Sequence, residues 1–225
     1  MPANEVFDGV YAVGGPDLTA MDDAYAYLID FGDEQVLIDS GAGVKPERLI
    51  SNIGDALKRK SNISLLILTH NHIDHVGGAG DIRSRTGAKI AVHEADAPAL
   101  ETGDPERTAA SWYGISLAPM VLDILLKGEG GAFEAEGGSL CWIHTLGHTP
   151  GSISVLLERN GKKILFGQDI HGPFMPQFGS DKKKWRESMH GLLEIEPDIL
   201  CEGHYGFYKT PESVREFILS FFDRI

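Results

Sequence analysis

Four potential metal ligands lie within six residues of each other, directly after a run of apolar residues. Residues 70 to 75 read His-Asn-His-Ile-Asp-His. His70 and His72 are two positions apart, so an extended backbone points both side chains to the same side. Asp74 and His75 lie where the chain is expected to turn into a helix, and can face a second point a few ångströms away. Because zinc, iron and manganese accept imidazole and carboxylate ligands, this run predicts a metal site.

Three further segments each offer one ligand near the end of a predicted strand. His148 lies in a turn, Gly-His-Thr-Pro-Gly-Ser, between two apolar runs. Asp169 follows the apolar run 163–166, and His204 follows the run 199–201. Each of these residues alone is more typical of a capped turn or a solvated side chain. Together they are better candidates for metal ligands, because the run 70–75 needs more ligands to complete two metal sites.

The elements that must position these residues are mostly short strands. The 27 glycines fall between short apolar runs, as expected of strands joined by tight turns. The predicted strands are 6–13, 24–31, 35–38, 63–68, 88–92, 140–143, 153–157, 163–166 and 199–201. Helices are predicted to begin at Pro46, to end at Arg85, to span 184–193, and to begin at Thr210 with an apolar face that extends to Phe222.

Residues from about 94 to 130 differ in character from the rest. Segments 95–100 and 107–126, the second with a break near Pro119, have helical patterns and no strand signal. We find no linker, short repeat or low-complexity tract. The sequence therefore predicts one domain over residues 1–225 with a helical insertion at about 94–130.

Composition excludes several function classes. Of the 225 residues, 42 % are hydrophobic and 24 % charged, as in ordinary globular proteins, and the net charge of −13 disfavours a nucleic-acid binder. Cys141 and Cys201 form no Cys-x-x-Cys pair, which argues against a thiolate zinc site or a disulfide framework. The most apolar stretch, 115–126, is too short to span a bilayer, and residues 1–8 show no signal peptide. We expect a cytoplasmic protein that binds neither nucleic acid nor membrane.

These motifs together resemble those of the metallo-β-lactamase superfamily. The resemblance covers the run His-x-His-x-Asp-His, then Gly-His-Thr-Pro-Gly-Ser, a strand-end Asp and a strand-end Gly-His, in the order that the family has them. The segment Ile38-Asp39-Ser40-Gly41 matches the family's first motif as well. The resemblance implies an α/β (α+β) fold, a four-layer αββα sandwich with a binuclear metal site at one edge.

The resemblance also assigns roles to the ligands. One metal would be bound by His70, His72 and His148, the other by Asp74, His75 and His204, and Asp169 would bridge the two. Asp74 and Asp169 are also the candidate catalytic residues. Asp39 would orient ligands, a role that is compatible with capping a turn as well. The expected cofactors are two divalent ions, zinc first, with iron or manganese as alternatives.

Two such ions about 3.5–4 Å apart can share a hydroxide and polarise the oxygen under attack. No serine or cysteine nucleophile is then needed, and the nearest elbow-like string, residues 114–118, lacks its last glycine. We therefore predict a metal-dependent hydrolase that uses a metal-bridging hydroxide on a small ester, thioester or lactone. The alternatives are a non-haem iron oxidoreductase acting on a sulfur substrate and a non-catalytic metal-binding module.

The branches of the superfamily narrow the substrate only in part. β-Lactamases of the family lack a bridging carboxylate, so Asp169 argues against antibiotic hydrolysis. Glyoxalase II enzymes share Gly-His-Thr-Pro-Gly-Ser but carry a long C-terminal extension that grips glutathione, whereas only twenty-one residues follow His204 here. Lactonases of this fold place a tyrosine shortly after the bridging Asp, and residues 170–174 contain none.

Four residues outside the ligand set are candidate contacts for a small-molecule substrate: His171, Tyr205, Trp112 and Tyr113. The segment from Trp112 to Leu126 has too many large apolar residues for a solvated helix pair. Our hypothesis is that it roofs the metal site. A homodimer contact is the alternative, because exposed apolar patches mark interaction sites.

Overall fold

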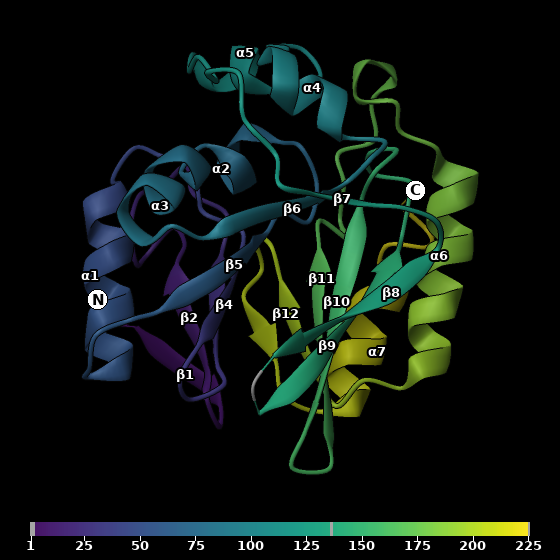
Figure 1. Cartoon of the computed structure of the whole chain (residues 1–225). Helices are drawn as coiled ribbons and strands as arrows, with labels where there is room; N and C mark the ends of the chain where they lie inside the picture. Colours follow the sequence, from purple (N-terminus) through teal and green to yellow (C-terminus); the bar gives the residue numbers. More distant parts are fainter. Residues whose placement is uncertain (1–2, 136, 225) are drawn as a thin grey trace.

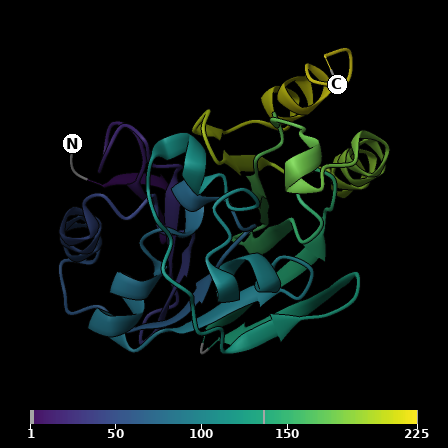
Figure 2. The same cartoon turned by 90° about the horizontal axis from the view of Figure 1, so that it is seen from above.

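The computed structural model describes residues 3–135 and 137–224, and its strands form two sheets (Figures 1 and 2). The first sheet has seven strands in the order β1-β2-β3-β4-β5-β6-β7. The second has six, in the order β13-β12-β11-β10-β9-β8. The strands are β1 Asn4–Phe7, β2 Val10–Gly14, β3 Ala26–Asp30, β4 Gln35–Ile38, β5 Ile63–Ile67, β6 Lys89–His93, β7 Ile124–Leu126, β8 Gly130–Ala135, β9 Gly138–His144, β10 Ile153–Arg159, β11 Lys162–Gln168, β12 Ile199–Glu202 and β13 Phe207–Tyr208.

The helices lie outside the two sheets. They are α1 Pro46–Leu57, α2 Ile73–Val76, α3 Ala79–Thr86, α4 Ala97–Thr102, α5 Ala110–Tyr113, the 3₁₀ helix η1 Pro176–Phe178, α6 Lys182–Ile195 and α7 Pro211–Leu219. Helices α1 and α3 pack on the first sheet, and α6 and α7 pack on the second. No helix in the described part of the chain is long and apolar enough to cross a membrane.

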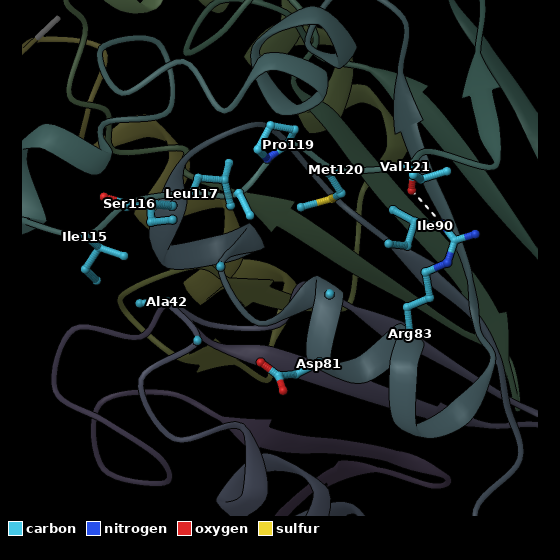
Figure 3. A pocket seen from close by; sticks show the side chains of 15 residues that line it. Ala42, Asp81, Arg83, Ile90, Ile115, Ser116, Leu117, Pro119, Met120 and Val121 are labelled. Atoms are coloured by element: carbon cyan, nitrogen blue, oxygen red, sulfur yellow. Dashed lines mark hydrogen bonds between the residues drawn. The ribbon is translucent and has the colours of Figure 1, made fainter.

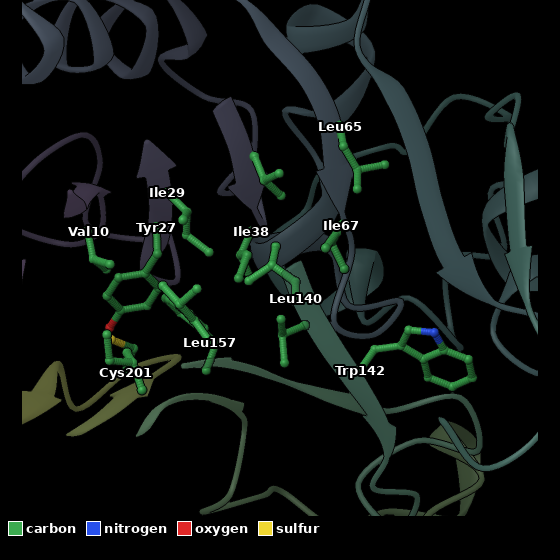
Figure 4. Close-up of a cluster of buried hydrophobic side chains, with 14 of the residues drawn as sticks. Val10, Tyr27, Ile29, Ile38, Leu65, Ile67, Leu140, Trp142, Leu157 and Cys201 are labelled. Atoms are coloured by element: carbon green, nitrogen blue, oxygen red, sulfur yellow. The ribbon is translucent and has the colours of Figure 1, made fainter. Parts of the chain in front are cut away.

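Strand alternation explains why both faces of each sheet are covered. In β3, Tyr27 and Ile29 point into the core between the sheets, while Leu28 points to the helices. Successive residues of a strand face opposite sides, so a strand that is apolar throughout must be buried on both. The core between the sheets contains residues of both, including Leu140 and Leu157 of the second (Figure 4). The predicted four-layer αββα sandwich is confirmed.

Parallel pairing brings the candidate ligands together. Strands β4, β5, β6 and β7 are parallel neighbours, and so are β11 and β12. The helices that connect parallel strands return the chain to the same end of the sheet, so the segments after the carboxyl ends of these strands collect at one edge. Asp39 follows β4, His70 follows β5, Asp169 follows β11 and His204 follows β12.

Two sequence-based expectations are wrong. Residues 6–13 form two strands, β1 and β2, because Gly9 takes a left-handed φ of 69° and turns the chain. The helical reading of 107–126 holds only for α5, since Gly114 ends that helix with φ 64°. The segment then runs without helix into β7, which pairs with β6. The three apolar residues of β7 are too few for their period to indicate helix or strand. They form a strand because the edge of β6 offers unpaired backbone groups with which they can pair.

Candidate metal centre

The ligand run follows β5 and enters the short helix α2. His72 has an extended backbone, φ −71° and ψ 143°, and precedes the helix that carries Asp74 and His75. The two glycines after the run have no room for a side chain. A Cβ on Gly77 would lie 2.2 Å from the Ala42 carbonyl oxygen, and one on Gly78 2.4 Å from that of Ser40. The helix therefore packs directly against the loop after β4.

The first group of candidate ligands consists of His70, His72, His148 and Asp169. Their ligand atoms all lie within 4.8 Å of one another, and all four residues are buried. His148 Nε2 is 3.0 Å from His72 Nδ1. Nε2 of His70, Nε2 of His72 and Oδ1 of Asp169 are buried without a hydrogen-bond partner. Such atoms are costly unless something satisfies them, and a cation would.

The second group consists of Asp74, His75 and His204, whose ligand atoms also lie within 4.8 Å of one another. His204 Nε2 is 3.2 Å from Asp74 Oδ2. His75 Nε2 is buried and forms no hydrogen bond. Both groups offer imidazole nitrogens and carboxylate oxygens, the donors that suit a divalent transition metal, so the residues present fit two such ions.

Asp169 lies between the two groups. Its Oδ1 is 3.0 Å from His75 Nε2, although the geometry does not make a hydrogen bond. Its Oδ2 is 3.6 Å from His148 Nε2 in the first group and 3.3 Å from His204 Nε2 in the second. A Cβ on Gly203 would stand only 2.4 Å from Asp169 Oδ1, so the chain beside this carboxylate has to be glycine. One carboxylate therefore faces both groups, as a bridge requires.

The two groups differ electrostatically. Burial lowers the pKa of His72 to about 4 and also lowers the pKa values of His70 and His148, so these rings are neutral at pH 7. Burial opposes protonation of His204 as well, but Asp169 and Asp74 raise its pKa to about 10. Since metal ions compete with protons for ligands, the first group is ready to bind an ion and the second must first release a proton.

Asp39 holds two parts of the ligand run in place. Its Oδ2 accepts hydrogen bonds from His75 Nδ1 at 2.7 Å and from the Thr69 hydroxyl at 2.7 Å, and its Oδ1 accepts from the Thr69 amide at 2.8 Å. With Nδ1 of His75 engaged as a donor, its Nε2 presents a lone pair to the site. Asp39 thus has the position expected of a residue that orients a ligand.

Two buried carboxylates that position the site were not recognised from the sequence. Asp96, after β6, accepts hydrogen bonds from the Thr149 hydroxyl at 2.7 Å and the Gly151 amide at 2.8 Å, and so holds the loop that carries His148. Glu202, at the end of β12, accepts from the amides of His204 and Tyr205. The only available signal was the position of each residue at or just after the end of an apolar run.

Asp96 should make stability depend on pH. Burial raises its pKa from 3.8 to about 6, so the folded state disfavours the charged form. The resulting destabilisation is absent below about pH 4, grows as the pH rises, and is complete above about pH 6, where it reaches about 3 kcal/mol. Relative to the parent, Asp96→Asn should therefore gain stability between pH 4 and pH 7. Urea unfolding of both metal-free proteins across this range tests this; parallel curves would contradict it.

A cavity of about 260 Å³ opens onto the candidate ligands. Apart from His72, Asp74, Asp169 and His204, it is lined by Ala109, Trp112, Tyr113, His171, Pro173 and Phe178. Three of the four predicted substrate contacts therefore line it. Tyr205 is not among the lining residues; it is exposed, and its ring packs against His171 with the centroids 5.0 Å apart.

The segment predicted to cover the metal site does so over only a small part of its length. Of the segment from Trp112 to Leu126, only Trp112 and Tyr113 line the cavity at the candidate ligands. Residues 115–121 instead run over a separate cavity of about 570 Å³, whose opposite wall includes Asp81 and Arg83 of α3 (Figure 3). Arg83 holds this segment by donating to the Val121 carbonyl at 2.6 Å, which keeps it on α3 and away from the ligands.

Known proteins resemble this chain in sequence along most of its length. The hydroxyacylglutathione hydrolase GloC of Haemophilus influenzae is 29 % identical over 206 residues, which is 86 % of this chain and 90 % of that protein. The acyl-coenzyme A thioesterase MBLAC2 of Bos taurus is 29 % identical over 185 residues, covering 72 % of this chain. The match spans 63 % of that longer protein.

Solved structures share the fold. The MIM-2 metallo-beta-lactamase superposes with a TM-score of 0.81 at 22 % identity, over 99 % of this chain and 88 % of that one. The family model of the metallo-beta-lactamase superfamily matches residues 21–204, a range that contains every candidate ligand described above. The chain belongs to the metallo-beta-lactamase superfamily.

Proposed function

We propose that this protein is a binuclear metal-dependent hydrolase that acts on a small ester, thioester or lactone. The observation that carries the proposal is Asp169, a buried carboxylate that faces both groups of candidate ligands. When bound, two divalent ions would supply a hydroxide near neutral pH and polarise the carbonyl oxygen under attack. The resemblance to a hydroxyacylglutathione hydrolase and an acyl-coenzyme A thioesterase supports a carbonyl substrate.

The chain's own residues shape the space where such a substrate would react. Burial and the Asp74 carboxylate, to which the Tyr113 hydroxyl is hydrogen bonded, raise the pKa of Tyr113, so its phenol keeps its proton. Tyr113 therefore places a neutral hydroxyl at the cavity, with its hydrogen donated to Asp74 and its oxygen free to accept a hydrogen bond. Phe178 packs on the His72 ring with the centroids 4.4 Å apart, and Trp112 packs on Phe178 at 4.9 Å. These rings therefore form an apolar wall beside His72.

The walls favour an uncharged, apolar group on the substrate. Ala109, Trp112, Pro173 and Phe178 are apolar, and no lysine or arginine of the described chain lines this cavity. A charged group that contacts these walls, away from the candidate ligands, would lack a lysine or arginine partner, and burying an unpaired charge is costly. A volume of about 260 Å³ accommodates a small acyl group. We therefore favour a small apolar acyl ester, thioester or lactone over glutathione conjugates.

Metal analysis combined with a substrate panel tests the proposal. The purified protein is analysed for bound metals, stripped with a chelator, reloaded with zinc, manganese or iron, and assayed on aliphatic esters, acyl thioesters, lactones and phosphodiesters. We expect two ions per chain and hydrolysis of at least one carbonyl substrate, lost on stripping and restored on reloading. Oxygen uptake with a sulfur substrate by the iron-loaded protein, without hydrolysis of any carbonyl substrate, would overturn it.

Trp112 should determine substrate affinity rather than metal binding. It is 52 % exposed, so Trp112→Ala should alter stability little, yet it removes the ring that packs on Phe178 at the cavity. We expect KM for the best substrate to rise about tenfold, or 1.4 kcal/mol, with metal content unchanged. Val121→Ala is the matched control, because Val121 is exposed on the same segment but lines the other cavity. Loss of bound metal, or equal effects in both variants, would refute the assignment.

A further inference from the structure

His171 is tied to a buried carboxylate at the edge of the candidate metal centre. Its Nδ1 is 2.8 Å from Glu202 Oε1, and Glu202 is completely buried. An ionised carboxylate only accepts hydrogen bonds, so the Nδ1 of His171 carries the hydrogen. Its other ring nitrogen, Nε2, is then available for another partner. His171 also lines the cavity at the candidate ligands.

Glu202 holds His171 and the loop of His204 together. Its Oε2 accepts hydrogen bonds from the His204 amide at 2.7 Å and the Tyr205 amide at 2.8 Å. The His171 and His204 rings have centroids 5.0 Å apart. A ligand atom of His171 lies within 4.8 Å of ligand atoms of both Asp169 and His204. This third group shares two residues with the centre described above.

Two of the candidate metal ligands, His75 and His148, show the same pattern of hydrogen bonding. His75 Nδ1 donates to Asp39, and His148 Nδ1 is 3.0 Å from the Pro173 carbonyl oxygen, which leaves Nε2 directed to the centre in each case. A histidine that ligates a metal almost always donates its other ring hydrogen to a carboxylate or carbonyl in this way. His93 differs, because Gly128 and Ala95 engage both of its ring nitrogens.

We propose that His171 is an additional ligand of the second ion, beyond the seven residues of the two groups. The proposal rests on the binuclear centre proposed above. With His171, the second ion would have donor atoms from Asp74, His75, His204, His171 and the shared Asp169. Five protein donors exceed the four of a tetrahedral zinc site, so the second position suits a metal of higher coordination number.

Metal titration without any substrate tests this role. The metal-free protein is titrated with Co²⁺, and the dissociation constants of the first and second ion and the visible spectrum are recorded. His171→Asn is the informative variant, because its amide can still donate to Glu202 while Nε2 is removed. We expect the second ion to bind 10–100-fold more weakly with an altered spectrum, and the first ion to bind as in the parent. His190→Asn, an exposed histidine on α6, is the control.

The outcomes are separable. A folded His171→Asn protein that binds both ions as the parent does would overturn the assignment. Should this variant not fold, His171→Phe keeps an aromatic ring against Tyr205 without a ligand nitrogen, and the same weakening is expected. If the parent itself binds a single ion, the binuclear centre fails, and with it the second position that His171 would serve. A raised KM with unchanged Co²⁺ affinity would make His171 a substrate contact and likewise overturn the assignment.

Discussion

Replacing Asp169 with asparagine should leave about one metal ion per chain and abolish most turnover. The carboxylate faces both ligand groups, with its Oδ1 3.0 Å from His75 and its Oδ2 3.6 Å from His148. Asparagine keeps the size, but removes the negative charge that offsets two dications and offers only one good ligand oxygen. Replacing a residue that merely supports a ligand costs 10–100-fold in metal affinity or activity. Loss of the bridge itself should cost at least that, about 1.4–2.8 kcal/mol or more.

The second ion should be the one that is lost. The first group retains three histidines, His70, His72 and His148, which suffice for a site of the carbonic-anhydrase type. Elemental analysis, steady-state kinetics and circular dichroism test the prediction together. Asp123→Asn is the control, because Asp123 is a carboxylate that accepts hydrogen bonds from the Ile90 amide and Arg83 and lies outside the candidate ligand groups. An Asp169→Asn protein with two ions and a nearly normal kcat would show that Asp169 is not the bridge.

Asp39→Asn should also impair binding of the second ion and turnover, to an extent similar to Asp169→Asn but for a different reason. The asparagine oxygen can still accept from the Thr69 amide, but its NH₂ group would then face Nδ1 of His75, which Asp39 accepts from at 2.7 Å. His75 would be driven to the tautomer with hydrogen on Nε2, and that nitrogen could no longer bind a metal. The same substitution beside a catalytic histidine in a serine protease lowers kcat about 10⁴-fold through the wrong tautomer.

We expect Asp39→Asn to lower the affinity for the second ion by 100-fold or more and to lower kcat by a similar factor. The first ion should bind as in the parent. Isothermal titration with zinc separates the two binding steps. Thr69→Val is the informative comparison, because it removes the 2.7 Å hydroxyl contact to Asp39 but leaves the His75 contact in place. If Thr69→Val lowers the affinity for the second ion as strongly as Asp39→Asn does, the loss reflects packing around Asp39 and the tautomer argument is wrong.

Local sequence patterns correctly predicted those elements whose boundaries are set by residues adjacent in the sequence. Strand β4 was predicted with its observed bounds, because the apolar residues Val36, Leu37 and Ile38 end at the turn of Asp39. The start of α1 at Pro46 and of α7 after Thr210 followed from capping chemistry, which acts within one helical turn. Strand β7 was missed, because its pairing with β6 joins residues more than thirty positions apart.

The sequence by itself determined the family, the four-layer fold and the chemical types of the candidate ligands. The ligand run could be recognised because its members are close in the chain and their spacing sets their direction. The resemblance to the family already implied how the ligands group and that Asp169 lies between the groups. Only the tertiary structure decided the distances from Asp169 to each group, and that Asp96 and Glu202 support the loops of the ligands. It also decided that residues 115–121 lie over α3 and not over the candidate ligands. These arrangements depend on contacts between strands and loops distant in sequence, which the burial of apolar surface selects and no local period encodes.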